Sequence, residues 1–193
     1  MRARLAAFPR EPVGVGSLIP AAVAVALLAN RAGAPCFLIT RRAPDLRRHA
    51  GQWALPGGRL DPGESPAAAA MRELWEEIGV PNAGVEVAGA LDDYVTRSGY
   101  LITPVVLLLP PSPRLRPNPG EVAAAYRVPL AVLESSGNPI IQEAGEATTL
   151  RFRILGRLIN PPTAAILHQL SEVVGHGRHT RVAHFVQPQF TWT

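Results

Sequence analysis

The stretch that decides the fold is Gly58–Val80, GRLDPGESPAAAAMRELWEEIGV, in which glutamates recur at helical spacing. Glu73, Glu76 and Glu77 stand at i, i+3 and i+4, so on a helix they share one face with Cβ atoms about 5–6 Å apart. Carboxylates held this close repel one another, and a hard divalent cation turns the repulsion into coordination. The pattern therefore predicts a helix that holds a divalent metal ion.

The ends of this helix can be predicted as well. Ser65 is a suitable N-cap, Pro66 fits the first helical position because its missing N–H is no loss there, and Gly79 is a typical stop signal. The loop before the helix, residues 56–63, is rich in glycine and proline. Such a loop permits unusual dihedral angles and a close approach of the backbone to a ligand.

The alternative interpretation is a solvated amphipathic helix whose glutamates and arginine form surface ion pairs, which is the usual meaning of a charged helical face. Such a helix requires neither a glycine-rich entry loop nor the additional Glu64 just before it. It also gives no reason for Arg72, whose guanidinium is placed at i, i+4 to hold the Glu76 carboxylate in one orientation. We therefore favour the metal site.

At every fixed position the pattern resembles the signature of the Nudix hydrolases. The matching residues are Gly58, Glu64, Arg72, Glu73, Leu74, Glu76, Glu77, Gly79 and Val80, with Trp75 and Ile78 standing between them. The resemblance implies an α+β fold, a Nudix-type α/β/α sandwich with a mixed β-sheet and a loop–helix–loop catalytic motif. It also implies an enzyme that hydrolyses a nucleoside diphosphate linked to another group.

The resemblance gives each charged residue of the motif a role. The metal ligands that it implies are Glu73, Glu76, Glu77 and the backbone carbonyl of Gly58. Arg72 would orient Glu73, and Glu64 would position water or lie just outside the direct ligands. The cofactor would be Mg²⁺ or Mn²⁺, which neutralises charge at the leaving oxygen and makes bound water a better nucleophile.

A further acidic residue, Glu121, follows residues 110–120, a stretch with five prolines and one glycine that predicts a long irregular loop near the site. In many Nudix enzymes a carboxylate in such a loop binds metal or takes a proton from water, and the resemblance implies one of these catalytic roles for Glu121. The alternative is a carboxylate that is only solvated, as most loop carboxylates are.

Four arginines lie upstream within eight residues: Arg41, Arg42, Arg47 and Arg48. They indicate phosphate contacts, against the alternative of general surface charge. The register of Arg42 and Arg47 with Gly51 and Pro56-Gly57-Gly58 resembles the additional motif of the coenzyme A diphosphatase branch of Nudix enzymes. The resemblance implies coenzyme A or acyl-CoA as substrate, 3′,5′-ADP and (acyl-)4′-phosphopantetheine as products, and a set of substrate-binding residues. This set is Arg42, Arg47, Gly57 and Gly58.

Trp53 stands where that pattern has a valine, and it leaves alternatives open. We favour packing in the core over stacking on a base. A large residue at this position is similar to what Nudix enzymes acting on other nucleotides have. The alternative function is therefore a pyrophosphatase for ADP-ribose, a dinucleotide or a nucleoside triphosphate. A non-catalytic nucleotide sensor of the same fold is a further one, although such modules commonly lose motif glutamates that this chain keeps.

Length and composition predict one globular domain with two extensions. The chain has 193 residues, of which 47% are hydrophobic, enough to bury a core. We expect an extension over residues 1–17, a Nudix hydrolase domain over 18–174, and a loosely ordered tail over 175–193. Within the domain we expect strands over 91–94, 102–109 and 150–154, the second of them central, and a closing helix over 163–174.

Charge and targeting signals favour a cytoplasmic enzyme with a small-molecule nucleotide diphosphate as its partner. The net charge is +4, but the arginines are scattered without an aromatic-interleaved motif, so we expect no nucleic acid. The apolar run over 18–29 is too short to span a bilayer, and its part over 22–28 is predicted to pair with 36–40 as a hairpin, so we expect no membrane. The single Cys36 excludes an internal disulfide and reads as a buried thiol. A homodimer is left open.

Overall fold

The computed structural model describes residues 1–46, 50–111, 113–144 and 147–187. Arg47 and Arg48, which belong to the arginine cluster above, lie outside these residues. In the described part the central sheet has eight strands, in the order β3-β2-β1-β7-β5, with β4 beside β1, β6 beside β7 and β8 beside β2. The pairing of β1 with β7 is parallel and the others are antiparallel, which confirms the mixed sheet.

The strands of the central sheet are β1 (Ile19–Ala29), β2 (Pro35–Arg42), β3 (Trp53–Ala54), β4 (Gly57–Arg59), β5 (Glu86–Ala90), β6 (Tyr94–Val95), β7 (Tyr100–Leu108) and β8 (Val122–Pro129). A separate three-stranded sheet consists of β9 (Ile140–Ala144), β10 (Ala147–Ile154) and β11 (Arg157–Ile159). The helices are α1 (Arg2–Ala6), α2 (Pro66–Ile78), η1 (Leu130–Glu134), α3 (Thr163–Leu170) and η2 (Ser171–His176).

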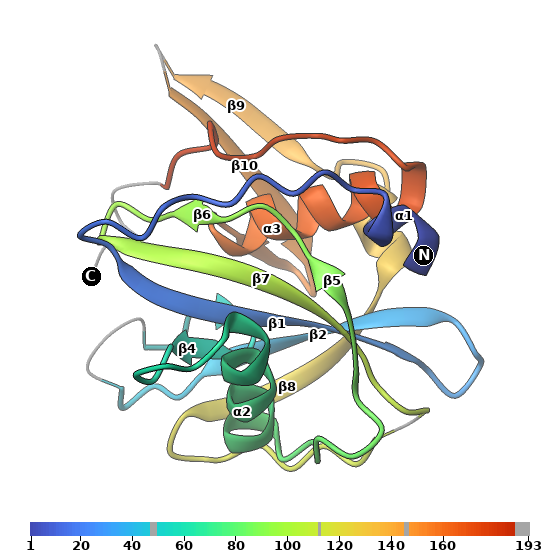
Figure 1. Ribbon diagram of the computed structural model, residues 1–193. Helices are drawn as coiled ribbons and strands as arrows, with labels where there is room; N and C mark the ends of the chain where they lie inside the picture. The colour runs from blue at the N-terminus through green and yellow to red at the C-terminus, as the bar shows by residue number, and fades with distance from the viewer. Residues whose placement is uncertain (47–49, 112, 145–146, 188–193) are drawn as a thin grey trace.

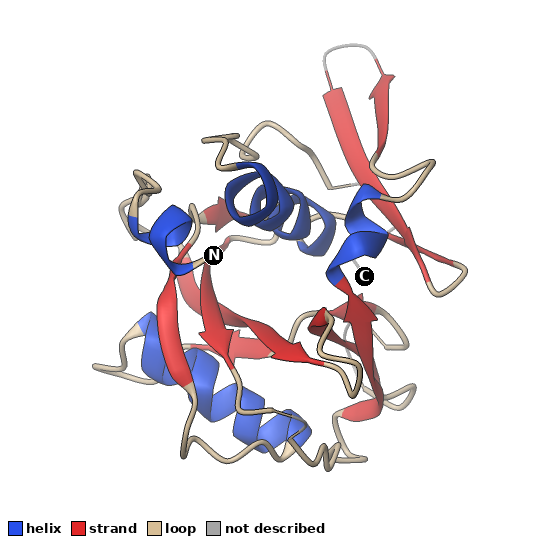
Figure 2. Ribbon diagram, turned by 90° about the vertical axis from the view of Figure 1, so that its right-hand side faces the viewer, coloured by secondary structure: helices blue, strands red, loops and turns tan. Residues whose placement is uncertain are grey.

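Helices lie on both faces of the central sheet, with α2 on one face and α1 and α3 on the other (Figures 1 and 2). The alternation of β1 explains how it serves both layers, because successive side chains of a strand point to opposite faces. Its residues Ala22, Ala24 and Ala26 are buried on the α2 side, and their small size lets that helix pack closely. The predicted α/β/α sandwich is confirmed.

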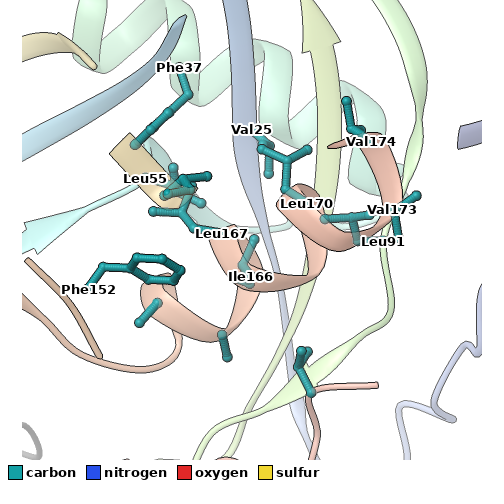
Figure 3. Packing of buried hydrophobic residues seen from close by; sticks show 14 of the residues in the cluster. Val25, Phe37, Leu55, Leu91, Phe152, Ile166, Leu167, Leu170, Val173 and Val174 are labelled. Atoms are coloured by element: carbon teal, nitrogen blue, oxygen red, sulfur yellow. The ribbon is translucent and has the colours of Figure 1, made fainter. Parts of the chain in front are cut away.

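The other side chains of β1 face the layer of α3. Figure 3 shows Leu167 and Leu170 of α3 directed towards Val25 of β1 and Phe37 of β2. The closing helix predicted over 163–174 is present as α3 and η2. The hairpin of β1 and β2 is also as predicted, and Cys36 in β2 is a buried free thiol.

The predicted strand over 91–94 is wrong in its bounds. Strand β5 ends at Ala90 and β6 begins at Tyr94, which leaves Asp92 and Asp93 buried between them. The sequence predicts a strand over 91–94 because apolar residues flank the two aspartates. The two carboxylates are instead used as acceptors for the terminal segments.

Both chain ends are anchored at this point. Asp93 accepts from Arg10 at 2.5 Å and from the backbone N–H of Val13 at 2.8 Å, whereas Asp92 accepts from Arg181 at 2.9 Å. Four side chains of the terminal segments are buried in the α3-side core: Leu5, Phe8, Val182 and Phe185. The prediction of a loosely ordered tail is therefore wrong for its described residues, 175–187.

Candidate active site

The glutamate-bearing helix α2 has the ends that the sequence predicts. The Ser65 hydroxyl accepts from the N–H of Ala68 at 3.2 Å, and Pro66 is the first helical residue. Gly79 ends the helix in the left-handed region at φ 68°, and its N–H donates to the carbonyl of Trp75 at 2.8 Å. These caps define where α2 begins and where it ends.

Arg72 joins three glutamates of the motif. Its Nη1 donates to Glu73 at 2.8 Å and to Glu76 at 3.0 Å, while its Nη2 donates to the carbonyl of Arg59 at 3.0 Å. Its Nε and Nη2 also donate to the two oxygens of Glu64, each at 3.0 Å. The fixed fork of the guanidinium thus aligns α2 with the loop that precedes it.

Both oxygens of Glu64 are already engaged. Besides its bonds to Arg72, Glu64 Oε2 accepts from the backbone N–H of Asp61 at 2.9 Å. The hydrogen bond to Arg72 is the largest cause of a lowered Glu64 pKa. This arrangement favours a Glu64 that holds Arg72 in place over one that positions water.

Glu73 and Glu77 are the buried carboxylates of the motif, whereas the Glu76 side chain is 48% exposed. Burial raises the pKa of Glu73, and the adjacent Arg72 opposes the rise. Burial also raises the pKa of Glu77 to about 8, against the opposing charge of Arg42, whose Nη1 lies 3.7 Å from Glu77 Oε1. A bound cation would remove the cost of ionising both groups.

The glycines of β4 allow the backbone to reach these carboxylates. A Cβ atom on Gly58 would lie 2.6 Å from the Cδ atom of Glu73, and one on Gly57 would lie 2.7 Å from Cγ1 of Val23. No real side chain fits at either distance. The Gly58 carbonyl predicted as a metal ligand therefore belongs to a strand that lies directly against Glu73.

The loop predicted near the site does reach it. Residues 113–120 contain no helix or strand, and the N–H groups of Arg116 and Asn118 donate to the carbonyls of Ile78 and Glu77 at 2.6 and 2.9 Å. Glu121 follows, and its charge contributes to the raised pKa values of both Glu73 and Glu77. The structure thus brings Glu121 to the acidic face of α2.

The residues fit a divalent cation by their chemistry, although the described residues contain no three acidic, histidine or cysteine side chains already placed around one point. Instead Glu73 and Glu76 turn to Arg72. The donors are all oxygens, as Mg²⁺ and Mn²⁺ prefer. Among the described residues, four glutamates of the motif form ion pairs with two arginines, so negative charge is left over. The glutamates are Glu64, Glu73, Glu76 and Glu77, and the arginines are Arg42 and Arg72.

A cavity of about 500 Å³ opens beside β4, and Thr163 and Ile166 of α3 line it as well. No glutamate of the motif is among its described lining residues. Three of the predicted substrate-binding residues line it: Arg42, Gly57 and Gly58. Trp53 lines it too, half-buried, and stacks on Tyr126 with ring centroids 4.9 Å apart. Trp53 therefore both packs against the core and presents a wall to the cavity, so the two interpretations of this residue are not exclusive.

The sequence did not predict that segments after the glutamate helix would form part of the wall of this cavity. Arg59 donates to the Tyr100 hydroxyl at 3.1 Å at one side of the cavity. Leu158 and Asn160 come from β11 and the turn after it. Because β11 has only three residues and joins the small sheet, no periodic pattern in the sequence could have placed it here.

The chain matches known proteins over most of its length. A model of the NUDIX domain matches residues 18–147. The "Uncharacterized Nudix hydrolase NudL" of Photorhabdus laumondii is 42% identical over 145 residues, which span 72% of this chain and 78% of that protein. The protein of the same name from Escherichia coli K12 is 45% identical over 98 residues, 50% of this chain and 51% of its own.

Solved structures agree on the fold. The Nudix hydrolase RenU from M. smegmatis superposes with a TM-score of 0.56 at 24% identity, covering 81% of this chain and 86% of that one. A Nudix hydrolase from Alicyclobacillus acidocaldarius gives 0.51 at 20% identity, covering 81% and 91%. The acidic helix, the glycine strand beside it and these matches lead to one conclusion: the chain belongs to the Nudix hydrolase family.

Proposed function

We propose that this Nudix diphosphatase hydrolyses coenzyme A or an acyl-CoA to 3′,5′-ADP and (acyl-)4′-phosphopantetheine. The observation that carries the proposal is the position of Arg42, whose spacing to the Gly57-Gly58 pair defines the resemblance to the coenzyme A branch. Arg42 lies 3.7 Å from Glu77 and lines the cavity together with both glycines. A guanidinium between the acidic face and the cavity suits an anionic diphosphate.

The motif residues would divide the work of binding and positioning. Glu73, Glu76, Glu77 and the Gly58 carbonyl would hold the metal. When bound, Mg²⁺ or Mn²⁺ would neutralise charge on the diphosphate and lower the pKa of a water molecule. Arg72, fixed by Glu64, would keep the Glu73 carboxylate turned towards the metal, and Arg42 would pair with a phosphate oxygen.

Glu121 would receive the proton of the attacking water. In the hydrolysis the water oxygen forms a bond to one phosphorus, the bond from that phosphorus to the bridging oxygen breaks, and the bridging oxygen leaves with the other phosphate. The Glu121 side chain is half-buried, and its Oε1 atom accepts a long hydrogen bond from Asn118 Nδ2 at 3.4 Å. A carboxylate so placed can act as a general base.

The remaining expectations also stand as proposals. We propose a catalytic domain over residues 18–174, with an N-terminal extension over 1–17 and a C-terminal tail over 175–193, and Arg47 as a further phosphate ligand. The partner would be a small-molecule nucleotide diphosphate, with neither nucleic acid nor a membrane involved, and the enzyme would act in the cytoplasm, alone or as a homodimer. In the described residues no helix has the length and apolar character needed to cross a bilayer.

The test is a substrate panel with product identification. Purified enzyme with Mg²⁺ or Mn²⁺ would be incubated separately with coenzyme A, acetyl-CoA, ADP-ribose, a diadenosine polyphosphate and a nucleoside triphosphate, and products would be identified by mass spectrometry. We expect 3′,5′-ADP from both coenzyme A substrates, with Glu73→Gln as the inactive control. Rapid turnover of ADP-ribose without turnover of coenzyme A would overturn the proposal in favour of the alternative function.

A further inference from the structure

A second cavity, of about 470 Å³, adjoins the first on the other side of Trp53. Its walls come from the end of β2, from both ends of the loop that follows, from β3 and from β11. The lining residues are Arg41, Arg42, Pro44, Gly51, Trp53, Arg157 and Leu158. Three of them, Arg42, Trp53 and Leu158, line the first cavity as well. The two cavities are therefore direct neighbours.

The second cavity is basic. Among the described residues that line it, three are arginines and none carries a carboxylate. Arg41 and Arg157 come from β2 and β11, more than a hundred residues apart, so their convergence is a product of the fold and not of a local basic run. Arginine is the side chain best suited to binding phosphate through two parallel hydrogen bonds.

These guanidinium groups are available to a ligand. Within the described residues, neither Arg41 nor Arg157 has an ion pair or a side-chain hydrogen bond. The Nε atom of Arg42 is buried without a hydrogen-bond partner, a state that costs free energy unless a ligand supplies an acceptor. Leu158, between the two cavities, is 43% exposed although it is apolar, as expected for a side chain that a ligand would cover.

We propose that this cavity binds a phosphomonoester carried by the substrate, namely the 3′-phosphate on the adenosine ribose. The inference rests on the proposed function, in which the diphosphate lies at Arg42 and Gly58. The diphosphate and the 3′-phosphate are attached to the same ribose, so a substrate anchored at Arg42 brings its second phosphate to the adjoining Arg41 and Arg157. The cavity would thus select coenzyme A over substrates whose ribose has a free 3′-hydroxyl.

The experiment compares two product-like probes by titration calorimetry: 3′,5′-ADP, which carries the additional phosphate, and 5′-AMP, which lacks it. We expect the wild type to bind 3′,5′-ADP about tenfold more tightly. In Arg157→Gln and Arg41→Gln the ratio of the two affinities should fall towards one. Arg153→Gln is the matched control, because Arg153 is an exposed arginine of the same hairpin that lines neither cavity, and it should keep the wild-type ratio.

Equal affinities of the wild type for both probes would overturn the inference, as would a preference that survives in both Arg157→Gln and Arg41→Gln. Circular dichroism of each variant would establish that it is folded. The proposed function fails separately: in that case neither coenzyme A nor dephospho-coenzyme A is hydrolysed with metal present, whatever the affinity ratio. A binding preference without hydrolysis would keep the phosphate site and remove the substrate assignment.

Discussion

Arg72 and Glu64 form a two-point contact, in which Nε and Nη2 of the guanidinium lie 3.0 Å from Oε1 and Oε2 of the carboxylate. The contact joins α2 to the loop before it and leaves Nη1 of Arg72 for Glu73 and Glu76. Arg72 therefore sets the position of the predicted metal ligands without being one itself. Residues that orient metal ligands in this way commonly affect activity strongly.

Replacing Arg72 by lysine tests this relationship. Lysine keeps the charge but cannot make the two parallel bonds to Glu64, so Glu73 loses its fixed orientation. We expect kcat to fall by about 10- to 100-fold with a smaller change in KM. Steady-state kinetics would measure both, with Arg31→Lys, at an exposed position in the β1–β2 turn, as the control. Unchanged kcat in Arg72→Lys would contradict the positioning role.

Glu77 should make the metal-free protein less stable as pH rises. Its folded-state pKa is raised by burial from the usual 4.5 to about 8, so the folded protein holds the proton more tightly than the unfolded chain does. Its stabilising contribution is fully present below about pH 4.5 and is lost as pH rises through about 8. Glu77→Gln removes this dependence, because the amide does not ionise.

Urea unfolding in the presence of a chelator would measure the effect. The difference in the free energy of unfolding, Glu77→Gln minus wild type, should increase as the pH rises from 5 to 8.5. The variant should also lose hydrolytic activity. Parallel stability profiles for the two proteins over this range would show that Glu77 is not a buried carboxyl with a raised pKa.

Gly58→Ala should disrupt the site through a single methyl group. The added Cβ would lie 2.6 Å from the Cδ atom of Glu73, so either β4 or the carboxylate must move. We expect turnover to fall by about 10- to 100-fold, in the range seen when a metal ligand is misplaced. Gly14→Ala is the control, because a Cβ there has no atom within 4 Å. Full activity of Gly58→Ala would place the reacting groups elsewhere.

Asp93→Ala should reduce stability rather than catalysis. It removes a buried carboxylate that accepts from Arg10, Val13 and Thr103, and thus releases the N-terminal segment from the sheet. The free energy of unfolding should fall by about 3 kcal/mol, as for the loss of one partner of a buried ion pair. Chemical unfolding would measure this change. KM for the substrate should remain near its wild-type value, and a large change in KM with unchanged stability would contradict the assignment.

The glutamate helix could be predicted from the sequence because its information is local. Ser65, Pro66 and Gly79 mark the ends by their backbone preferences, and the spacing of Glu73, Glu76 and Glu77 follows from the helical repeat. Long strands of the central sheet could be predicted for the same reason, because they are long apolar runs. In each case neighbouring residues were sufficient.

What could not be predicted depends on contacts between distant segments. Asp92 and Asp93 lie beside apolar residues, so the sequence predicts a strand there. In the structure the Asp93 carboxylate accepts from Arg10 and the Asp92 carboxylate accepts from Arg181, which come from the two chain ends. Arg157 lies on the three-residue strand β11, and only the folded chain brings it to the cavity that Arg41 also lines. Periodicity within one element contains no information about such pairings.

The central claim is that the acidic face of α2 exists to bind a divalent cation. Titration of the folded protein with Mn²⁺ at pH 8.5, followed by the loss of the free-ion electron paramagnetic resonance signal, tests it most directly. We expect saturable uptake by the wild type and at least a tenfold weaker uptake by the Glu73→Gln/Glu77→Gln double variant. Absence of uptake by the wild type, with or without nucleotide, or equal uptake by both proteins, would contradict the claim.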